Sequence, residues 1–450
     1  MGNREPRRRK CLGLILATLI GIICSSAPFQ TYASLPKEIR LFPGQARAID
    51  FSIPIAAEVT LDNPDVVRVN GEAKRSWSMR LDRPISLVSH STGQAELNVR
   101  LFGTIPYKKV KLNVIPDLRV IPGGQTIGVK IRSAGIMVVG HHQVRTEDGR
   151  RFSPGRQADI QTGDLIMEMN GQRINDVRKV ADLVDQAGRS GEPIRMKVKR
   201  KDRLFDAELT PVYDAEDRAY RMGLYIRDSA VGVGTLTFYA PDQGIYGALG
   251  HVITDMDTQM PIEVGSGEIV HSTVTSISKS QNGSPGEKRA HFFREDKVLG
   301  TIEKNTRFGI FGRMKDLPDY GMIREPIPVA FADEVHPGPA QIMTVVEGNR
   351  VETYDIEIVY AARQETPATK GLIIRITDPR LIEKTGGIVQ GMSGSPIIQD
   401  GKLAGAVTHV FVNDPTSGYG CFIEWMLQEA GILLTSRDWN EDRLKRLKAS

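Results

Sequence analysis

Residues 391–398 read Gly391-Met392-Ser393-Gly394-Ser395-Pro396-Ile397-Ile398, a run of small residues that leads into an apolar, β-branched segment. This pattern predicts a tight turn followed by a strand. A serine hydroxyl is a weak nucleophile and must be exposed and paired with a base to react. When it attacks a carbonyl group, the negative oxygen that forms needs backbone N–H groups aimed at it. Because glycines allow the backbone to turn such groups inward, Ser393 is a candidate nucleophile.

The same stretch resembles the nucleophile loop of chymotrypsin-like peptidases, in which Gly-Asp-Ser-Gly-Gly-Pro is usual. The resemblance implies Ser393 as the nucleophile and the N–H groups of Gly391 and Ser393 as the oxyanion hole. Ser395 is a competing candidate, but it stands where the usual loop has the second glycine of its pair. Met392 replaces the usual aspartate and removes a negative charge that some of these enzymes use on activation. The alternative without chemistry is a glycine-serine turn between two strands.

A second string, Gly247-Ala248-Leu249-Gly250-His251-Val252-Ile253-Thr254-Asp255, surrounds one histidine with small residues and glycine. A single histidine is often only a hydrogen-bonded structural group. Here His251 precedes Ser393 in the chain, which is the order of base and nucleophile in the chymotrypsin-like triad. Residues 222–439 are also rich in β-type segments and glycine. We therefore predict a β-barrel-type, chymotrypsin-like serine peptidase domain over residues 222–439, with His251 as general base.

Residues 120–213 show a different pattern. Gly163-Asp164-Leu165-Ile166 is followed by an Asn170-Gly171 turn and by a helical pattern with Val177, Val180, Ala181 and Val184 on one face. This order resembles a PDZ domain, an α+β module that binds an extended peptide as an added strand. The resemblance implies a carboxylate-binding loop at Gln125, Thr126, Ile127 and Gly128. It also makes Val177 the first groove-facing helix position, favouring an apolar ligand residue. An ordinary α/β domain whose glycines only make turns is the alternative.

The chain begins with a segment that is typical of export. Five of its first ten residues are Arg4, Arg7, Arg8, Arg9 and Lys10, and an apolar run from Cys11 to Cys24 follows. A basic stretch, a short apolar stretch and then small residues are the form of a secretory signal. The apolar run is shorter than the roughly 20 residues that span a bilayer comfortably, yet it could remain as an anchor. We predict a signal or anchor over residues 1–34; a buried core helix is the alternative.

Between this segment and the PDZ-like region, residues 35–116 alternate apolar and polar positions in short runs separated by turn-formers such as Asn70-Gly71. This pattern predicts a small antiparallel β domain with no catalytic constellation. Together the regions predict a mainly β, multidomain chain, as its 450 residues and 40% apolar content require.

Charge and cysteine content limit the function classes. The net charge of +5 includes +4 from the first ten residues, five cations less Glu5, so the remainder carries only about +1. That balance lacks the basic footprint of a nucleic-acid-binding protein. Three cysteines, two of them in the apolar run, provide neither a disulfide framework nor a metal-binding CxxC pattern. Cys421 is interpreted as a small buried apolar residue.

The two strings, the PDZ-like region and the export segment together resemble the stage IV sporulation protein B peptidases. Matching stretches also occur at residues 234–239, 377–379, 386–390 and 406–415. The resemblance covers the chain beyond the N-terminal β domain, and it implies Asp378 as the acid that orients His251. Asp378 lies only fifteen residues before Ser393 (393 − 378) and precedes a proline, so a turn or capping role is also open. Asp255, Asp319 and Asp333 are alternative acids, and His409 is interpreted as a packed histidine.

The resemblance implies a function as well. The chain would be secreted from the developing spore into the space between its two membranes, where it would cut other copies of itself and a membrane-bound regulator, stage IV sporulation protein FA. That cut would lead to sigma-factor processing in the mother cell. The chemistry would be acyl transfer without metal or organic cofactor. Two rival functions remain: a secreted, non-catalytic PDZ adaptor, and a quality-control peptidase of broad specificity.

Overall fold

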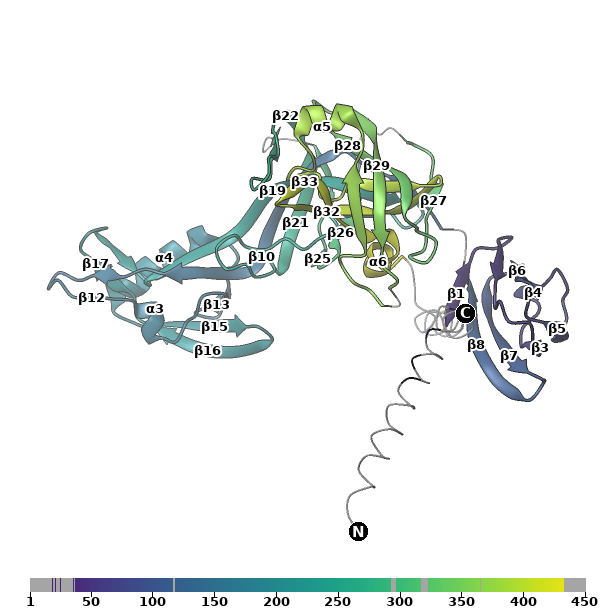
Figure 1. Ribbon diagram of the computed structural model, residues 1–450. Helices are drawn as coiled ribbons and strands as arrows, with labels where there is room; N and C mark the ends of the chain where they lie inside the picture. The colour runs from purple at the N-terminus through teal and green to yellow at the C-terminus, as the bar shows by residue number, and fades with distance from the viewer. Residues whose placement is uncertain are drawn as a thin grey trace, which may run out of the picture. The chain divides into compact units, whose positions relative to one another are not determined.

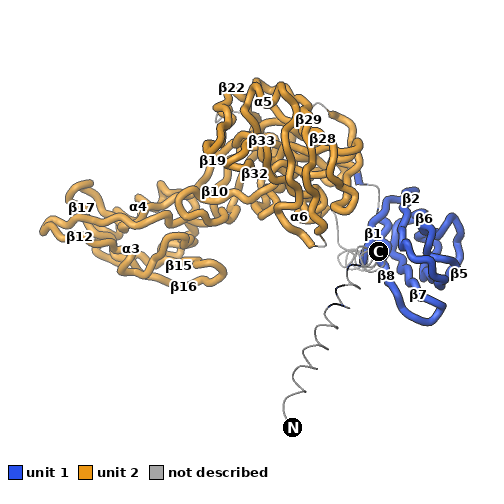
Figure 2. Tube along the Cα trace, viewed as in Figure 1, with its two compact units in different colours: residues 1–118 blue, residues 119–450 orange. Residues whose placement is uncertain are grey.

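The computed structural model describes residues 18, 21, 25, 35, 37–115, 118–292, 297–316, 323–364 and 366–432. Most of these residues lie in strands, and the chain separates into two compact units, residues 1–118 and 119–450 (Figure 2). The predicted mainly β, multidomain fold is confirmed. The predicted signal segment, apart from three residues, lies outside the described residues. None of the helices in the described part combines the length and apolarity needed to cross a bilayer.

The first unit consists of two sheets around its own core. Its strands alternate buried and half-buried positions, as in β7, and the inward side chains include Val59, Leu97 and Trp77. The five-stranded sheet has the order β1-β8-β7-β3-β5 and the three-stranded sheet the order β2-β6-β4. Pairing is antiparallel except between β1 and β8. The strands are β1 (Glu38–Leu41), β2 (Ala46–Ile49), β3 (Ala56–Leu61), β4 (Val67–Val69), β5 (Ser76–Arg80), β6 (Ile85–Ser89), β7 (Gly93–Leu101) and β8 (Ile105–Val114).

The PDZ part of the second unit packs helix α4 (Val177–Ser190) against a small sheet. Asp176 caps α4 through the Arg178 N–H group, and Gly191 ends it in the left-handed conformation that glycine adopts without strain. Val180, Val184 and Ala187 form its buried face. The other elements are β11 (Val144–Arg145), β12 (Arg151–Phe152), α3 (Pro154–Gln157), β13 (Leu165–Met169), β14 (Gln172–Arg173), β15 (Ile194–Arg200), β16 (Arg203–Leu209), β17 (Val212–Asp214) and β18 (Ala219–Arg221).

The peptidase part contains a closed six-stranded barrel of order β28-β29-β30-β33-β32-β31. Its elements are β28 (Gly338–Val345), β29 (Val351–Ala361), β30 (Leu372–Ile376), α5 (Pro379–Thr385), β31 (Pro396–Gln399), β32 (Lys402–Phe411), β33 (Asp414–Phe422) and α6 (Ile423–Glu429). The strands outside the barrel are β9 (Arg119–Pro122), β20 (Ile245–Ala248), β21 (Val264–His271), β22 (Thr273–Ser278), β23 (Glu287–His291), β24 (Val298–Thr301), β25 (Lys304–Thr306), β26 (Gly309–Arg313) and β27 (Ile327–Pro328). The predicted barrel-type domain is thus present.

Two long strands run through both parts of the second unit. Strands β10 (Thr126–His141) and β19 (Leu224–Ala240) pair antiparallel along most of their lengths (Figure 1). Their register shifts between Arg132 and Met137 on β10. One end of the pair joins β13 in the PDZ part, and the other joins β20 and β21 in the peptidase part. The two parts therefore do not separate into independent compact units.

Candidate active site

The loop that carries Ser393 is fixed to strand β19. The Thr235 N–H group donates to the Ser393 carbonyl at 3.0 Å, and the Thr235 hydroxyl donates to the Gly391 carbonyl at 2.7 Å. The Thr237 hydroxyl donates to the Gly394 carbonyl at 2.8 Å. Both threonines are fully buried. The loop lies between α5 and β31, so β19 and the barrel together determine its position.

The structure separates the two candidate serines. Ser395 is 0% exposed, and its hydroxyl has no hydrogen-bond partner within the described residues. Ser393 is partly exposed, lines a cleft, and donates its hydroxyl to the Thr408 carbonyl at 2.9 Å. A substrate could reach Ser393 without any rearrangement of the core. Met392 is fully buried, which fits an apolar side chain at this position better than a carboxylate.

Two backbone N–H groups in this loop are available to a ligand. In the part of the chain that the structure describes, the N–H groups of Gly391 and Ser393 donate to no protein acceptor, whereas those of Met392 and Gly394 are hydrogen-bonded. Gly391 and Gly394 adopt φ values of +93° and +94°, which favour glycine. These are the two groups that the sequence predicts for an oxyanion hole.

His251 follows β20 at the end of a close turn. Gly250 allows this turn to approach β32, because a Cβ atom there would lie 3.0 Å from Thr408 Cγ2. The His251 Nδ1 atom lies 2.8 Å from the Val252 carbonyl oxygen. Since that oxygen can only accept, Nδ1 carries the proton and Nε2 is left with a lone pair. Enclosure by protein lowers the pKa of His251, so the ring is neutral, as a general base must be.

Ser393 and His251 line one cleft of about 950 Å³. Neither side chain is hydrogen-bonded to the other: the hydroxyl is bound to Thr408 and Nδ1 to Val252. The structure therefore brings the predicted base and nucleophile to the same cleft, in an arrangement in which their proton-transfer contact is not made. Catalytic contacts of this kind often tighten only when substrate binds.

His409 was missed as a cleft residue by the sequence interpretation. It is exposed, lines the cleft, and its ring centroid lies 5.2 Å from that of His251. Its pKa is lowered to about 4 by partial enclosure, by His251 and by Lys370. On β32, His409 directly follows Thr408, whose backbone carbonyl accepts a hydrogen bond from the Ser393 hydroxyl. Strand β32 therefore places His409 next to the residue that holds the nucleophile. No local alternation marks this position: residues 406–408 are all buried, and the pairing of β32 with β33 shifts its register between Val407 and His409.

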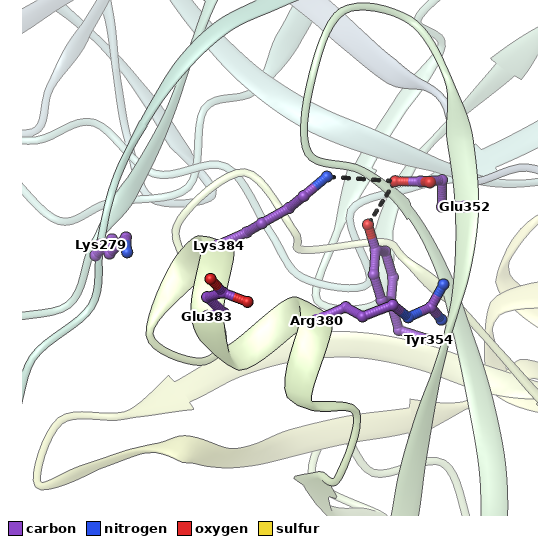
Figure 3. Close-up of a pocket in the computed structure, with 6 residues that line it drawn as sticks. All are labelled: Lys279, Glu352, Tyr354, Arg380, Glu383 and Lys384. Atoms are coloured by element: carbon purple, nitrogen blue, oxygen red, sulfur yellow. Dashed lines mark hydrogen bonds and ion pairs between the residues drawn. The ribbon is translucent and has the colours of Figure 1, made fainter.

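Asp378 does not meet His251 in this structure. Its carboxylate caps α5, accepting from the Arg380 N–H group at 2.9 Å and from the Arg380 guanidinium at 2.7 Å. That pairing holds the pKa of Asp378 below its usual value. Figure 3 shows Arg380 beside Tyr354 in a separate pocket of about 400 Å³, where Lys384 and Tyr354 contact Glu352. Asp378 thus has the capping role that its Asp-Pro sequence also suggested.

Asp255 is buried at the cleft, where its carboxylate pairs with Arg227 and accepts from the Thr258 N–H group at 2.9 Å. Asp333 is exposed, and Asp319 lies outside the described residues. In the described structure, the group that holds Nδ1 of His251 is therefore a backbone carbonyl and not a carboxylate.

A buried lysine that sequence reasoning does not predict lies beneath the loop. Lys288 of β23 is 1% exposed, and its ammonium group donates to the Thr344 hydroxyl at 2.7 Å. Burial lowers its pKa to about 7. A Cβ atom on Gly391 would lie 3.1 Å from Lys288 Cβ, so the lysine stem supports the Gly391 backbone. Nothing in the local sequence distinguishes Lys288 from a surface lysine.

The predicted carboxylate-binding loop is wrong. Gln125, Thr126, Ile127 and Gly128 are buried at or near the start of β10, and Ile127 and Gly128 pair with β19 on one edge and β21 on the other. Neither edge is free to accept a peptide strand. Gly128 does require glycine, but because a Cβ atom would lie 2.8 Å from the Val270 side chain.

The features expected of such a loop occur at residues 221–224, immediately before β19. Gly223 has a φ of +69°, and the Met222 and Gly223 carbonyls accept from the N–H groups of Gly155 and His142 at 2.8 and 2.9 Å. The N–H groups of Met222 and Gly223 donate to no acceptor among the described residues. The signal that could have found this loop is the apolar-glycine-apolar triplet Met222-Gly223-Leu224. Its chain position after the helix indicates a circularly permuted PDZ topology.

Val177 lies beside this strand. Its N–H group donates to the Asp228 carboxylate at 3.2 Å, and its side chain packs in the same apolar cluster as Leu224 and Ile226. The predicted role of Val177 at a peptide groove therefore remains a prediction, now with β19 as the neighbouring strand.

One group of possible metal ligands occurs in the described part of the chain. Donor atoms of His142, Asp214 and Asp217 lie within 4.8 Å of one another. Asp214 already accepts from two backbone N–H groups and Asp217 pairs with Arg221. None of the three lines the cleft of Ser393.

Comparison with known proteins gives two family matches. Residues 218–427 match the SpoIVB peptidase S55 family, and residues 127–210 match the PDZ domain family. The "Putative zinc metalloprotease BH06270" of Bartonella henselae is 33% identical over 82 residues, 18% of this chain and 22% of that protein. The chain thus spans about a fifth of that curated relative's length.

Two crystal structures of the Rv3671c protease are also similar to this chain. The inactive form is 16% identical and covers 45% of this chain and 85% of its own, with a TM-score of 0.27. The active form, from M. tuberculosis, is 14% identical and covers 46% and 76%, with a TM-score of 0.27.

Proposed function

We propose, since residues 218–427 belong to the SpoIVB peptidase S55 family, that the whole chain is a serine endopeptidase with Ser393 as nucleophile and His251 as base. The observation that carries this proposal is the convergence on one cleft of an accessible hydroxyl, a neutral imidazole and two backbone N–H groups that have no acceptor among the described residues. Acyl transfer needs these three components.

The geometry suggests the order of events. The Val252 carbonyl keeps the His251 proton on Nδ1, so Nε2 can accept the proton of Ser393. The Ser393 hydroxyl must first turn away from the Thr408 carbonyl. Its oxygen then attacks the peptide carbonyl, and the N–H groups of Gly391 and Ser393 stabilise the oxyanion. His251 returns the proton to the leaving amine, and water hydrolyses the acyl-enzyme.

The biological part of the proposal rests on the family. The family name supports a role in sporulation. The chain would be secreted across the forespore membrane and held there through its N-terminal segment. The proposed substrates are other copies of the chain and stage IV sporulation protein FA. The PDZ region, residues 127–210, would dock one of these polypeptides.

Replacing Ser393 tests the catalytic proposal directly. Purified wild-type protein, Ser393→Ala and Ser395→Ala are incubated with the extracytoplasmic part of the regulator and, in parallel, with unrelated unfolded proteins. We expect Ser393→Ala to lose activity by about a thousandfold or more. Ser395→Ala should retain activity, because its buried hydroxyl makes no hydrogen bond in the described structure. A fluorophosphonate probe should modify Ser393 in the wild type.

Three results would change the conclusion. Identical fragments from wild type and Ser393→Ala, with no labelling, would favour the adaptor. Cleavage that depends on Ser395 would move the nucleophile. General degradation of the unfolded proteins would favour the quality-control peptidase over the sporulation role.

A further inference from the structure

In the described structure, one edge of strand β19 has no strand partner along much of its length. Among the described strands, β10 pairs with one edge of β19 from Leu224 to Thr235. On the opposite edge, β20 pairs only from Leu236 onward. Residues 224–234 therefore present backbone groups that an added strand could bind.

This edge leads directly to the nucleophile. The Thr235 N–H group donates to the Ser393 carbonyl, so the unpaired part of β19 begins beside the nucleophile loop. Arg227 and residues 229–233 line the same cleft as Ser393 and His251. Within that stretch Val231 is 63% exposed, an apolar side chain in a position that a bound chain would cover. The cleft thus extends along β19 toward the PDZ part.

The other end of the edge starts at the loop formed by residues 221–224. There the Met222 and Gly223 carbonyls are turned into the protein, and their N–H groups have no acceptor among the described residues. Successive free N–H groups of this kind bind carboxylates. Arg221 adds a positive charge beside them, shared with Asp217. Val177 and Leu224 supply apolar surface for a terminal side chain.

The direction of β19 links the two ends. A peptide bound by a PDZ loop lies antiparallel to the strand that follows the loop, with its carboxyl terminus at the loop. Here that strand is β19, which runs from the loop to Ser393. A chain added to β19 therefore has its earlier residues at the cleft, in the extended form that a peptidase requires.

We propose that β19 is one continuous docking edge, and that the enzyme cuts a polypeptide with a free, apolar carboxyl terminus at a set distance from that terminus. This inference rests on the proposed peptidase function and adds the substrate class. Val233 and Leu224 are nine positions apart (233 − 224). One bound residue faces each residue of the strand, so the cut falls about ten residues before the terminus.

The test uses peptides of seven copies of one tetrapeptide that ends in valine, so that every potential cut site recurs. They are made as free acids, as amides, and with one further repeat at the carboxyl end, and mass spectrometry locates the cuts made by the full chain. The free acid should give one dominant cut about ten residues from its end, and the longer peptide should move the cut by one repeat. Amidation should lower kcat/KM at least about tenfold.

Two variants distinguish the effect of the positive charge at residues 221–224 from the effect of the protein's overall charge on the preference for a free carboxyl terminus. Arg221→Glu should weaken the preference for the free acid, while Arg203→Glu, an exposed residue of β16 with the same charge change, should not. Fluorescence anisotropy with Ser393→Ala protein should show the amide binding at least about tenfold more weakly than the acid.

The outcomes distinguish this inference from the peptidase proposal. Labelling of Ser393 by fluorophosphonate with cuts spread evenly over the repeats, or equal binding of acid and amide, would overturn the docking edge alone. Absence of both labelling and cleavage would overturn the peptidase function itself.

Discussion

At His251, the group that orients the imidazole is a backbone carbonyl. The carbonyl of Val252 fixes the tautomer but carries no full charge, so it stabilises a developing imidazolium less than a carboxylate would. Asp378, the acid implied by family resemblance, is bound to Arg380 in the described structure. If Asp378 does act on His251, it must leave its place at the start of α5.

The proposed acid role of Asp378 can be tested with Asp378→Asn. Asparagine also caps helices, so the unfolding temperature should change little. Loss of the charge should lower kcat by about a hundredfold or more if the acid role is correct. The matched control is Asp176→Asn, since Asp176 caps α4 and pairs with Arg178 in the same way. Unchanged kcat in Asp378→Asn would leave Asp378 only as the cap of α5.

Lys288 should make the stability of the protein depend on alkaline pH. Burial lowers its pKa from 10.5 to about 7, so between these values the unfolded chain holds a proton that the folded protein has lost. Stability contributed by this residue therefore rises from pH 7 to 10, by roughly 4 kcal/mol, and falls as pH returns toward 7.

Denaturant titrations across this range provide the measurement. Lys288→Met should be more stable than wild type at pH 7 and should lack the rise. Lys315→Met, at an exposed position, should keep it. A wild-type curve parallel to that of Lys288→Met would show that the ammonium group is not buried as described.

At the scale of the element, β19 organises the site. Thr235 and Thr237 hold the nucleophile loop, and the residues before them line the cleft. The loop in turn needs glycine at one position above all. A Cβ atom on Gly394 would lie 2.1 Å from the Thr235 carbonyl oxygen and 2.5 Å from the Leu249 backbone nitrogen.

Gly394→Ala should therefore be severely damaging. Its φ of +94° is strained for alanine, and relief of the clash must move either β19 or the turn that carries His251. We expect a loss of about 3 kcal/mol or more in the free energy of unfolding and a large loss of kcat. Gly401→Ala, with a φ of +73° but open space around it, should cost only about 1 kcal/mol and keep activity. Comparable losses in both variants would argue against the close approach.

At the scale of the whole molecule, the chain consists of two compact units: the first is a single domain, and the second contains two parts that share strands. The core of residues 35–118 is formed within that unit. The PDZ and peptidase parts instead share β10 and β19. The predicted PDZ boundaries, residues 120–213, include β13 but omit β19, the other strand that pairs with the second half of β10.

Fragments test this organisation. Residues 35–118 alone should unfold in one cooperative transition in thermal circular dichroism. Residues 120–213 should not, because Leu224 and Ile226, which pack with α4, are missing. Extension to residue 228 should restore cooperative unfolding. Equal transitions for the two PDZ fragments would show that β19 is dispensable there.

The sequence by itself was sufficient for features that depend on neighbouring residues: the β class, the glycine-flanked Ser393, the glycine-rich turn before His251 and the helix at Val177. Local conformation follows from local composition, so these predictions needed no long-range contact. It did not reveal which strand edge is free. For that reason the carboxylate-binding loop was predicted at residues 125–128, and the loop at residues 221–224 was not predicted. Nor did it show that Asp378 pairs with Arg380, that His409 faces the cleft, or that Lys288 is buried. Only the tertiary structure decided these points, because exposure and pairing arise from strands that are distant in the chain, and no local pattern records which of them will meet.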